Sequence, residues 1–258
     1  MVVVTTITTI PKLVHLTYKS FDSIPSHWKP SLDKWKEFGW EVKFWSDDDN
    51  DNLINTEYSQ FKDLYYNFAY SIQKVDLVRV CYLHKYGGVY CDLDLVPTVD
   101  LFDKLQNDCS LLCSPVDGKT FTNMFMAGVK QHPFWMFYLN AMRVTPPFWA
   151  LGKHLHVMFT TGPSLMNIAV KDFMKKYPTT KIVVLNRDWI KCDVCKVSAC
   201  NEGLLKVVKG QSWNSWDSKV YGWVWCNKKI VIAIISILFL LIVLRILSGN
   251  SVNSLQKK

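Results

Sequence analysis

The chain has fewer acidic than basic residues, and this shortage narrows the partners that it can bind. Its 258 residues include 22 Asp and Glu against 30 Lys and Arg, so the formal net charge is +8. A basic balance suits nucleic acid, an anionic membrane surface or a phosphorylated substrate. The sequence has no helix-turn-helix or zinc-finger motif, so we expect no nucleic-acid partner. A membrane or a phosphate-bearing molecule remains as the acidic partner.

The N-terminus lacks the pattern of a signal peptide. Residues 1–9 contain neither a basic segment nor a cleavage-site motif. The β-branched run from residue 2 to residue 17 instead predicts a strand that leads into a hydrophobic core. The acidic run at residues 46–52 lacks the glycine and the terminal glutamate of a calcium-binding loop, so it is interpreted as the cap of a following helix.

A single long apolar run lies near the C-terminus. Residues 230–247 contain one charged residue, Arg245, and one other polar residue, Ser236. At ~1.5 Å per residue this run measures about 27 Å, close to the ~30 Å core of a bilayer. We therefore predict a single-pass membrane protein with a domain at 1–216, a juxtamembrane linker at 217–229, a transmembrane helix at 230–247 and a polar tail at 248–258. Basic pairs flank the run on both sides, so the positive-inside rule does not give an orientation.

Between these ends, the hydrophobic pattern predicts alternating strands and helices, as in an α/β domain. The other predicted strands are residues 40–45, 110–114, 123–128 and 181–185. The predicted helices are residues 30–39, 68–83, 133–146 and 163–177. His154 and His156 occupy alternate positions in residues 154–161, which favours a polar strand face over an acceptor-binding role.

Two aspartates close the stretch Tyr-Gly-Gly-Val-Tyr-Cys-Asp-Leu-Asp at residues 86–94. In an extended strand Asp92 and Asp94 would point the same way, and their repulsion would cost roughly a kcal/mol or more. A divalent cation relieves that repulsion, and oxygen-only ligands suit Mg²⁺ or Mn²⁺. The pattern therefore predicts a metal–diphosphate site at the end of a strand; a solvated loop is the alternative.

The segment before the glycines adds a charged pair. Asp76 and Arg79 are three residues apart in the apolar run at 68–83, so they share one face of the predicted helix. An exposed pair of this kind would be an ordinary surface salt bridge. In a helix this apolar, the pair favours a functional role.

These motifs resemble a known family. Asp-Leu-x-Arg at 76–79, Tyr-Gly-Gly-Val-Tyr at 86–90 and Asp-x-Asp at 92–94 resemble the sugar-binding DxD region of glycosyltransferase family 32. Ile-Pro-Lys at 10–12, Thr-Gly-Pro at 161–163 and Ser-Trp at 212–213 resemble its outer landmarks. The family includes mannosyltransferases acting on glycans and on inositol phosphorylceramide.

The resemblance implies a GT-A-like α/β domain with a mixed central sheet that binds a GDP- or UDP-linked sugar. It implies Mn²⁺ (or Mg²⁺) bound by Asp92, Asp94 and Ser212. The implied reaction is retaining transfer of a hexose, mannose favoured, to a glycan or glycolipid acceptor. An active site in the lumen of a Golgi- or ER-type membrane is implied as well, whereas a tail anchor without a signal sequence would leave the domain in the cytosol.

The resemblance also implies roles for single residues. Arg79 would act with Asp92 and Asp94 in catalysis or recognise the sugar, and Asp76 would accept hydrogen bonds from sugar hydroxyls. Tyr90 would line the pocket, and the Trp213 indole would donate to a phosphate oxygen. Tyr18 stands where the family usually has Trp and would stack on the base, although a core tyrosine is the alternative.

One departure from the family keeps other functions open. Val207 and Val208 stand where relatives often have histidine, which leaves the third metal ligand open and allows a binding protein without turnover. A haloacid-dehalogenase-type phosphatase also uses Asp-x-Asp, but it needs a later Gly-Asp motif, and the sequence has no Gly-Asp dipeptide. Cys192, Cys195, Cys200 and Cys226 match no common zinc spacing, so a disulfide or loop thiols are favoured over zinc or redox chemistry.

Overall fold

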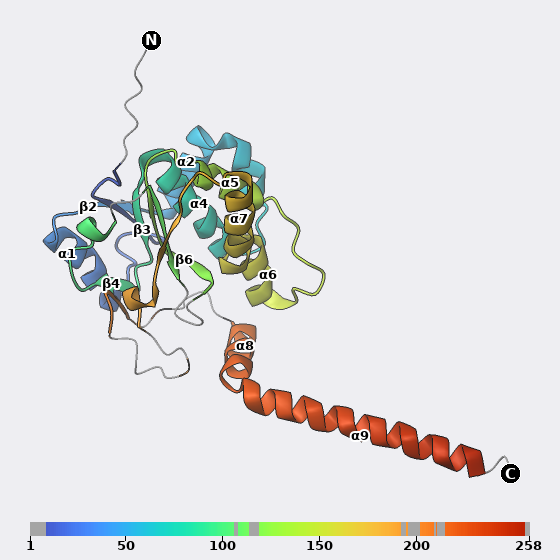
Figure 1. The fold of residues 1–258 in the computed structure, drawn as a ribbon. Coiled ribbons are helices and arrows are strands. Elements are labelled where there is room, and N and C mark those ends of the chain that lie inside the picture. Colours follow the sequence, from blue (N-terminus) through green and yellow to red (C-terminus); the bar gives the residue numbers. More distant parts are fainter. Residues whose placement is uncertain are drawn as a thin grey trace. The chain divides into compact units, whose positions relative to one another are not determined.

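A computed structural model describes residues 9–105, 108–113, 119–191, 195, 202–208, 210 and 215–255 (Figure 1). The chain forms two compact units, Met1–Trp213 and Asn214–Lys258. The first unit has an α/β fold around a mixed sheet, as expected. The predicted strand at residues 2–17 begins only at Leu13 within the described part, and residues 1–8 lie outside it.

Six strands form the central sheet in the order β2-β1-β3-β6-β5-β7. Their bounds are β1 Leu13–Thr17, β2 Glu41–Trp45, β3 Gly88–Cys91, β5 Cys109–Cys113, β6 Phe121–Gly128 and β7 Val183–Leu185. Strand β1 pairs in parallel with β2 and β3, and β5 pairs in parallel with β7. Strand β6 runs antiparallel to both β3 and β5. A separate two-stranded antiparallel sheet joins β4 Leu95–Pro97 to β8 Leu205–Val207.

Helices cover the sheet, and two hydrophobic clusters form the core. The helices of the first unit are α1 Lys29–Glu37, α2 Asp47–Glu57, α3 Lys62–Tyr66, α4 Ser71–Tyr86, α5 Pro133–Ala141, α6 Gly152–Thr160 and α7 Pro163–Lys176. Short 3-10 helices occur at Ser26–Trp28, Ser59–Phe61, Phe102–Lys104 and Arg187–Trp189. Tyr90 packs in the cluster with α4, α5 and α7, whereas its neighbours Val89 and Cys91 pack in the other cluster. This alternation follows from the period of two in a strand.

Helix α4 and the two glycines after it position the functional residues. Its central residues are buried, as the apolar run predicts, and it ends where Gly87 adopts a positive φ of 69°. Gly88 follows at φ 92°, and a Cβ there would lie 2.4 Å from the Leu13 carbonyl oxygen of β1. A residue with a side chain therefore cannot occupy position 88 without moving the backbone.

Other predicted elements are confirmed or corrected. The cap at residue 46 is confirmed, because the Ser46 hydroxyl accepts from the Asp49 N–H and the Asp49 carboxylate accepts from the Ser46 N–H. The predicted strand at 154–161 is wrong, because these residues belong to helix α6. In a helix, alternate residues point about 200° apart, so His154 and His156 share no face. The helix from Pro133 ends at Ala141, before the predicted stop at Pro146.

The second unit consists of α8 Trp216–Cys226 and α9 Lys228–Leu255. Among the described residues, no single helix is both long and apolar enough to cross a membrane. Helix α8 and the part of α9 up to Arg245, bent by 83° at their junction, meet these criteria together. Apolar side chains from Ile230 to Leu244 are largely exposed on α9.

The cysteines fall into two groups. Cys81, Cys91 and Cys109 are free and buried, as expected for small core residues. Cys195 and Cys226 are disulfide-bonded, whereas Cys192 and Cys200 lie outside the described residues. Disulfide bonding is one of the two alternatives favoured from the sequence.

Candidate active site

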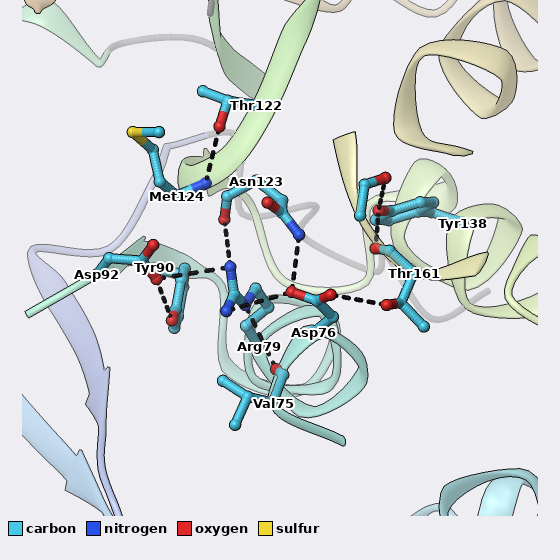
Figure 2. A network of polar contacts seen from close by, with 11 residues as sticks. Val75, Asp76, Arg79, Tyr90, Asp92, Thr122, Asn123, Met124, Tyr138 and Thr161 are labelled. Carbon is cyan, nitrogen blue, oxygen red and sulfur yellow. Dashed lines mark hydrogen bonds and ion pairs between the residues drawn. The ribbon is translucent and has the colours of Figure 1, made fainter. Parts of the chain in front are cut away.

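Polar side chains from four segments meet at the carboxyl end of β3 (Figure 2). They come from α4, from β3 and the turn that follows it, from the first half of β6, and from the α5 and α6–α7 region. The residues that make this network are Asp76, Arg79, Tyr90, Asp92, Asn123, Tyr138 and Thr161. Four of them, Asp76, Arg79, Tyr90 and Asp92, are candidate residues from the sequence.

The two aspartates lie on a turn, so the expectation of an extended strand at these positions is wrong. Strand β3 ends at Cys91, and the Leu95 N–H donates back to the Asp92 carbonyl at 3.0 Å. The Asp92 N–H still bonds across the sheet to Met124 O at 2.8 Å. The physical reason is topological: β3 and β4 belong to different sheets, so the chain must change direction between them. Asp92 and Asp94 make that change of direction.

A later segment of the chain passes directly against Asp94. The Val208 N–H donates to the Asp94 carbonyl at 2.8 Å, and Val208 follows β8. At position 210, a Cβ would lie 1.7 Å from Asp94 Oδ2, so only glycine leaves room for this carboxylate. Ser212 and Trp213, the other predicted site residues of this segment, lie outside the described residues.

Arg79 links the two parts of the network. Its guanidinium lies 3.3 Å from Asp76 Oδ1 and 3.5 Å from Asp92 Oδ1. It also donates to the backbone carbonyl of Asn123 at 2.9 Å. Only 3% of the residue is exposed, which excludes an ordinary surface salt bridge. Removing one partner of a buried ion pair destabilises the fold by about 3–5 kcal/mol, much more than removing one partner of a surface pair.

Asp76 is buried, and each of its carboxylate oxygens accepts a hydrogen bond. Asn123 Nδ2 donates to Asp76 Oδ1 at 2.9 Å, and the Thr161 hydroxyl donates to Oδ2 at 2.7 Å. The Thr161 carbonyl in turn accepts from the Tyr138 hydroxyl at 2.6 Å. The α6–α7 junction and β6 therefore fix the carboxylate that holds Arg79.

Burial changes the acidity of these groups. It raises the pKa of the Asp76 carboxyl to about 6, while Arg79 and the Thr161 hydroxyl counteract part of this rise. Burial also raises the pKa of Asp92, against the opposing effects of Arg79 and of the Tyr90 hydroxyl. Since the Asp92 side chain keeps 32% of its surface exposed, solvent moderates this shift. Burial disfavours the Arg79 charge, but Tyr90, Asp92 and Asp76 more than offset it, so the pKa of Arg79 is raised.

Tyr90 points to the same side as Asp92, as predicted. Its hydroxyl donates to Asp92 Oδ1 at 2.6 Å, and the Arg79 guanidinium carbon lies 4.5 Å from the centre of its ring. Burial raises the pKa of Tyr90 well above its usual value, so the phenol remains a donor at neutral pH. One Asp92 oxygen is thereby engaged by the protein. Its other oxygen, Oδ2, makes no hydrogen bond or ion pair with the described residues.

Two residues near the start of the chain are positioned by aromatic packing. Tyr18 is half-buried and lies edge-to-face with Trp28 at 5.5 Å between ring centres. His15 is a structural histidine, because it bonds the Gly87 carbonyl at 2.9 Å and accepts from Trp45 Nε1 at 3.2 Å. Burial lowers the pKa of His15 to about 4, so the ring stays neutral.

The turn fits a divalent cation that keeps water and phosphate ligands. Among the described residues, no three His, Cys, Asp or Glu side chains gather to hold a metal ion. Two carboxylates alone do not make a protein cage, but Mg²⁺ and Mn²⁺ are bound in that way beside substrate phosphates. The Asp92 Oδ2 atom and the partly exposed Asp94 side chain are consistent with such a ligand.

Asn123, Tyr138 and Thr161 have structural roles at the site that sequence reasoning missed. They lie 47, 62 and 85 positions after Asp76 in the sequence. No spacing rule connects a helix residue with partners so far away. Thr161 carried a signal only through the Thr-Gly-Pro resemblance, which gave it no role.

Comparison with known proteins defines the class. Residues 25–111 match the family described as the glycosyltransferase sugar-binding region containing a DXD motif. This range contains α4, both glycines and the Asp92–Asp94 turn. This part of the chain is thus homologous to the DXD-containing sugar-binding region of glycosyltransferases.

Two of the similar proteins are from yeasts. The chain is 29% identical over 221 residues to mannosyl phosphorylinositol ceramide synthase SUR1 from Saccharomyces cerevisiae, covering 82% of this chain and 53% of that protein. It is 27% identical over 244 residues to inositol phosphoceramide mannosyltransferase 1 from Schizosaccharomyces pombe, covering 90% of this chain and 72% of that protein. The chain therefore spans about half the length of the first of these relatives.

Solved structures with a similar chain trace are toxin domains. The PaToxG glycosyltransferase matches with a TM-score of 0.49 and 16% identity, over 66% of this chain and 71% of that one. The ligand-free glycosyltransferase domain from the YGT toxin matches with a TM-score of 0.46 and 9% identity, over 68% of this chain and 80% of that one.

Proposed function

We propose that this chain is a membrane-anchored, metal-dependent glycosyltransferase with a GT-A-like domain. It moves a hexose, with mannose favoured, from a GDP- or UDP-linked sugar to a glycan or glycolipid acceptor. One observation carries the proposal: Asp92 and Asp94 lie on a partly open turn at the end of β3, with buried Arg79 held behind Asp92. The match of residues 25–111 to a sugar-binding DXD region supports it.

The donor diphosphate is assigned to the Asp92–Asp94 turn. Asp94, Asp92 through its Oδ2 and Ser212 are the proposed ligands of Mn²⁺ or Mg²⁺. When bound, the cation neutralises negative charge that develops on the departing diphosphate. The protein contributes a fixed turn, because the N–H and carbonyl groups of Asp92 are both bonded to the main chain.

Arg79 and Asp76 are proposed to position the donor. Arg79 keeps Asp92 in one orientation, and its charge offsets part of the diphosphate charge. Asp76 Oδ2 accepts one hydrogen bond from Thr161, so it keeps a lone pair for a sugar hydroxyl. Tyr90 is proposed to line the pocket; its ring lies 4.5 Å from the Arg79 guanidinium carbon, and its hydroxyl donates to Asp92.

Two aromatic residues are proposed to complete the donor pocket. Tyr18 stacks on the base, and the Trp213 indole donates to a phosphate oxygen. The family resemblance favours retention of configuration, by transfer from the face that the leaving group departs. That path needs no separate enzymatic nucleophile.

The alternative is a membrane-anchored sugar- or nucleotide-binding protein of the same fold without turnover. Val208 favours it, because the residue whose N–H bonds the Asp94 carbonyl has an apolar side chain that ligates no metal. The intact Asp76, Arg79, Asp92 and Tyr90 network favours the enzyme.

The second unit supports the proposed membrane attachment, and two cysteines support the proposed compartment. The apolar exposed surface of α9 and the bent pair it forms with α8 support an anchor. Cys195 and Cys226 are disulfide-bonded, and such bonds persist in oxidising compartments. We therefore propose a single-pass protein whose active site faces the lumen of a Golgi- or ER-type membrane.

The proposal is tested by donor hydrolysis and transfer with the full chain in detergent. GDP- and UDP-sugars are supplied with Mn²⁺ or with EDTA, with and without glycan and inositol phosphoceramide acceptors, and nucleotide release is measured. We expect release from one donor, lost with EDTA and in Asp94→Asn. The control Asp103→Asn removes an exposed carboxylate outside the site and should leave the activity unchanged.

The outcomes separate the two functions. Metal-dependent donor binding without release, with all acceptors present, would establish the binding protein. If none of the donors binds in a metal-dependent way, both the enzyme and the binding protein are refuted.

A further inference from the structure

The loop between α5 and α6 exposes a group of large apolar side chains. Phe148 is 95% exposed, Leu151 is 71% exposed and Trp149 is 48% exposed. Val144, earlier in the same loop, is also exposed. Contiguous apolar surface of this kind marks an interaction site in a folded protein.

Backbone hydrogen bonds and one ring contact shape the loop, whose apolar side chains are exposed. Two short backbone bonds shape it, from Ala150 N–H to the Pro147 carbonyl and from Leu151 N–H to the Trp149 carbonyl, each at 2.8 Å. The Trp149 ring lies edge-to-face on Phe159 of α6, with 4.7 Å between the ring centres. The apolar tip (Phe148, Trp149 and Leu151) therefore contacts α6 through Trp149 and is not packed into the core.

The sequence on both sides of this tip carries basic charge only. No aspartate or glutamate occurs between Asp117 and Asp172, whereas five lysines and arginines occur there. Two of these basic residues, Arg143 and Lys153, flank the apolar tip in sequence. A segment with an apolar tip between basic residues is complementary in composition to an apolar layer covered by anions.

We propose that residues 143–153 are a membrane-docking loop that inserts Phe148, Trp149 and Leu151 into the headgroup–acyl boundary of an anionic lipid bilayer. Tryptophan, phenylalanine and leucine next to lysine and arginine are the composition of interfacial segments. The inference does not depend on which sugar is transferred.

Docking at this loop acts on the site through α6. The helix begins at Gly152, directly after the loop, and ends at Thr160. Thr160 accepts from Gln73 of α4 at 2.7 Å, and Thr161 donates to Asp76 at 2.7 Å. One helix therefore joins the lipid-facing loop to the buried carboxylate of the candidate active site, which sets the orientation of the site to the bilayer.

The test places a reporter in the loop of the full chain. The protein is reconstituted in nanodiscs of phosphatidylcholine with phosphatidylserine, and tryptophan quenching by lipids brominated near the headgroup is measured. Phe148→Trp should add quenched fluorescence relative to wild type, and Trp149→Phe should remove some. The matched control Phe21→Trp places a tryptophan at an exposed aromatic position outside the loop and should add fluorescence that is not quenched.

A second measurement follows the loop without any new tryptophan. Amide hydrogen exchange of residues 144–151 should slow on the order of tenfold in anionic nanodiscs relative to detergent, and Phe148→Ser with Leu151→Ser should abolish this protection. Absence of quenching at position 148 together with unchanged exchange would overturn the proposal. Equal quenching in pure phosphatidylcholine would overturn the anionic assignment. A detergent-stable dimer that the double serine variant dissociates, without lipid quenching, would assign the loop to a second copy of the chain instead.

Discussion

Thr161→Val tests whether the α6–α7 junction controls the acidity of the buried carboxylate. Valine has nearly the same shape as threonine, but it removes the hydroxyl that donates to Asp76 Oδ2 at 2.7 Å. Loss of a hydrogen bond to a buried charged group costs about 1.5–3 kcal/mol. Since one pKa unit corresponds to about 1.4 kcal/mol, the pKa of Asp76 should rise from about 6 by roughly one to two units.

The sign of the pH dependence follows from linkage. Between the ordinary aspartate value of 3.8 and about 6, the folded wild-type protein keeps a proton on Asp76 that the unfolded chain has released. The unfolding free energy contributed by this group therefore falls as pH rises through that window, and is fully present only below it. In Thr161→Val the fall should continue to roughly pH 7–8, because the folded pKa is higher.

The assay combines thermal unfolding with the pH profile of donor hydrolysis. At pH 8, a loss of about 2 kcal/mol should lower the melting temperature by roughly 4–8 °C in a chain of this size. The acid limb of kcat/KM should move up by roughly one to two pH units, because Asp76 must be ionised to hold Arg79. Thr56→Val, which removes an exposed hydroxyl on α2, is the control and should change stability by less than ~0.5 kcal/mol. A change as small as the control, with an unmoved acid limb, would refute the assigned role of Thr161.

Three further substitutions have expected outcomes. Gly210→Ala places a Cβ within 1.7 Å of the Asp94 carboxylate, so the Kd for Mn²⁺ and donor, measured by titration calorimetry, should rise on the order of tenfold or more; an unchanged Kd would contradict the contact. Gly88→Ala combines φ of 92° with a 2.4 Å approach to a β1 carbonyl, and thermal unfolding should show a loss of about 3 kcal/mol or no soluble protein. Tyr90→Phe removes the 2.6 Å hydrogen bond to Asp92, and kcat should fall roughly tenfold with the circular dichroism spectrum intact; wild-type kcat would show that this bond is not needed.

The sequence predicted the elements that hydrophobic burial controls directly. Helix α4 is recognisable because apolar residues surround Asp76 and Arg79, and burial of its central residues leaves few alternatives. The cap at Ser46 is a local effect of residues three apart, so sequence alone contains it. Two consecutive glycines break a helix locally, although the close approach of Gly88 to β1 depends on the folded sheet.

The incorrect predictions share one physical cause: contacts with residues distant in the sequence override the local hydrophobic pattern. His154 and His156 alternate like strand residues, but α6 packs Val157 and Thr160 inward at helical spacing. Asp92 and Asp94 also alternate, but the chain must pass from one sheet to another between them. The partners of Asp76 arrive from β6 and the α6–α7 junction, and nothing in the local sequence specifies their distance from it.

The pairing of β4 with β8 has a consequence for the timing of folding. Leu95 pairs with Val207, so the ladder beside Asp94 joins positions about 110 residues apart. A ribosome synthesising the chain exposes both aspartates long before it exposes β8. The candidate active site is therefore one of the last parts of the first unit to close, and a chain that stops before Leu205 would contain both aspartates without the strand that secures their turn.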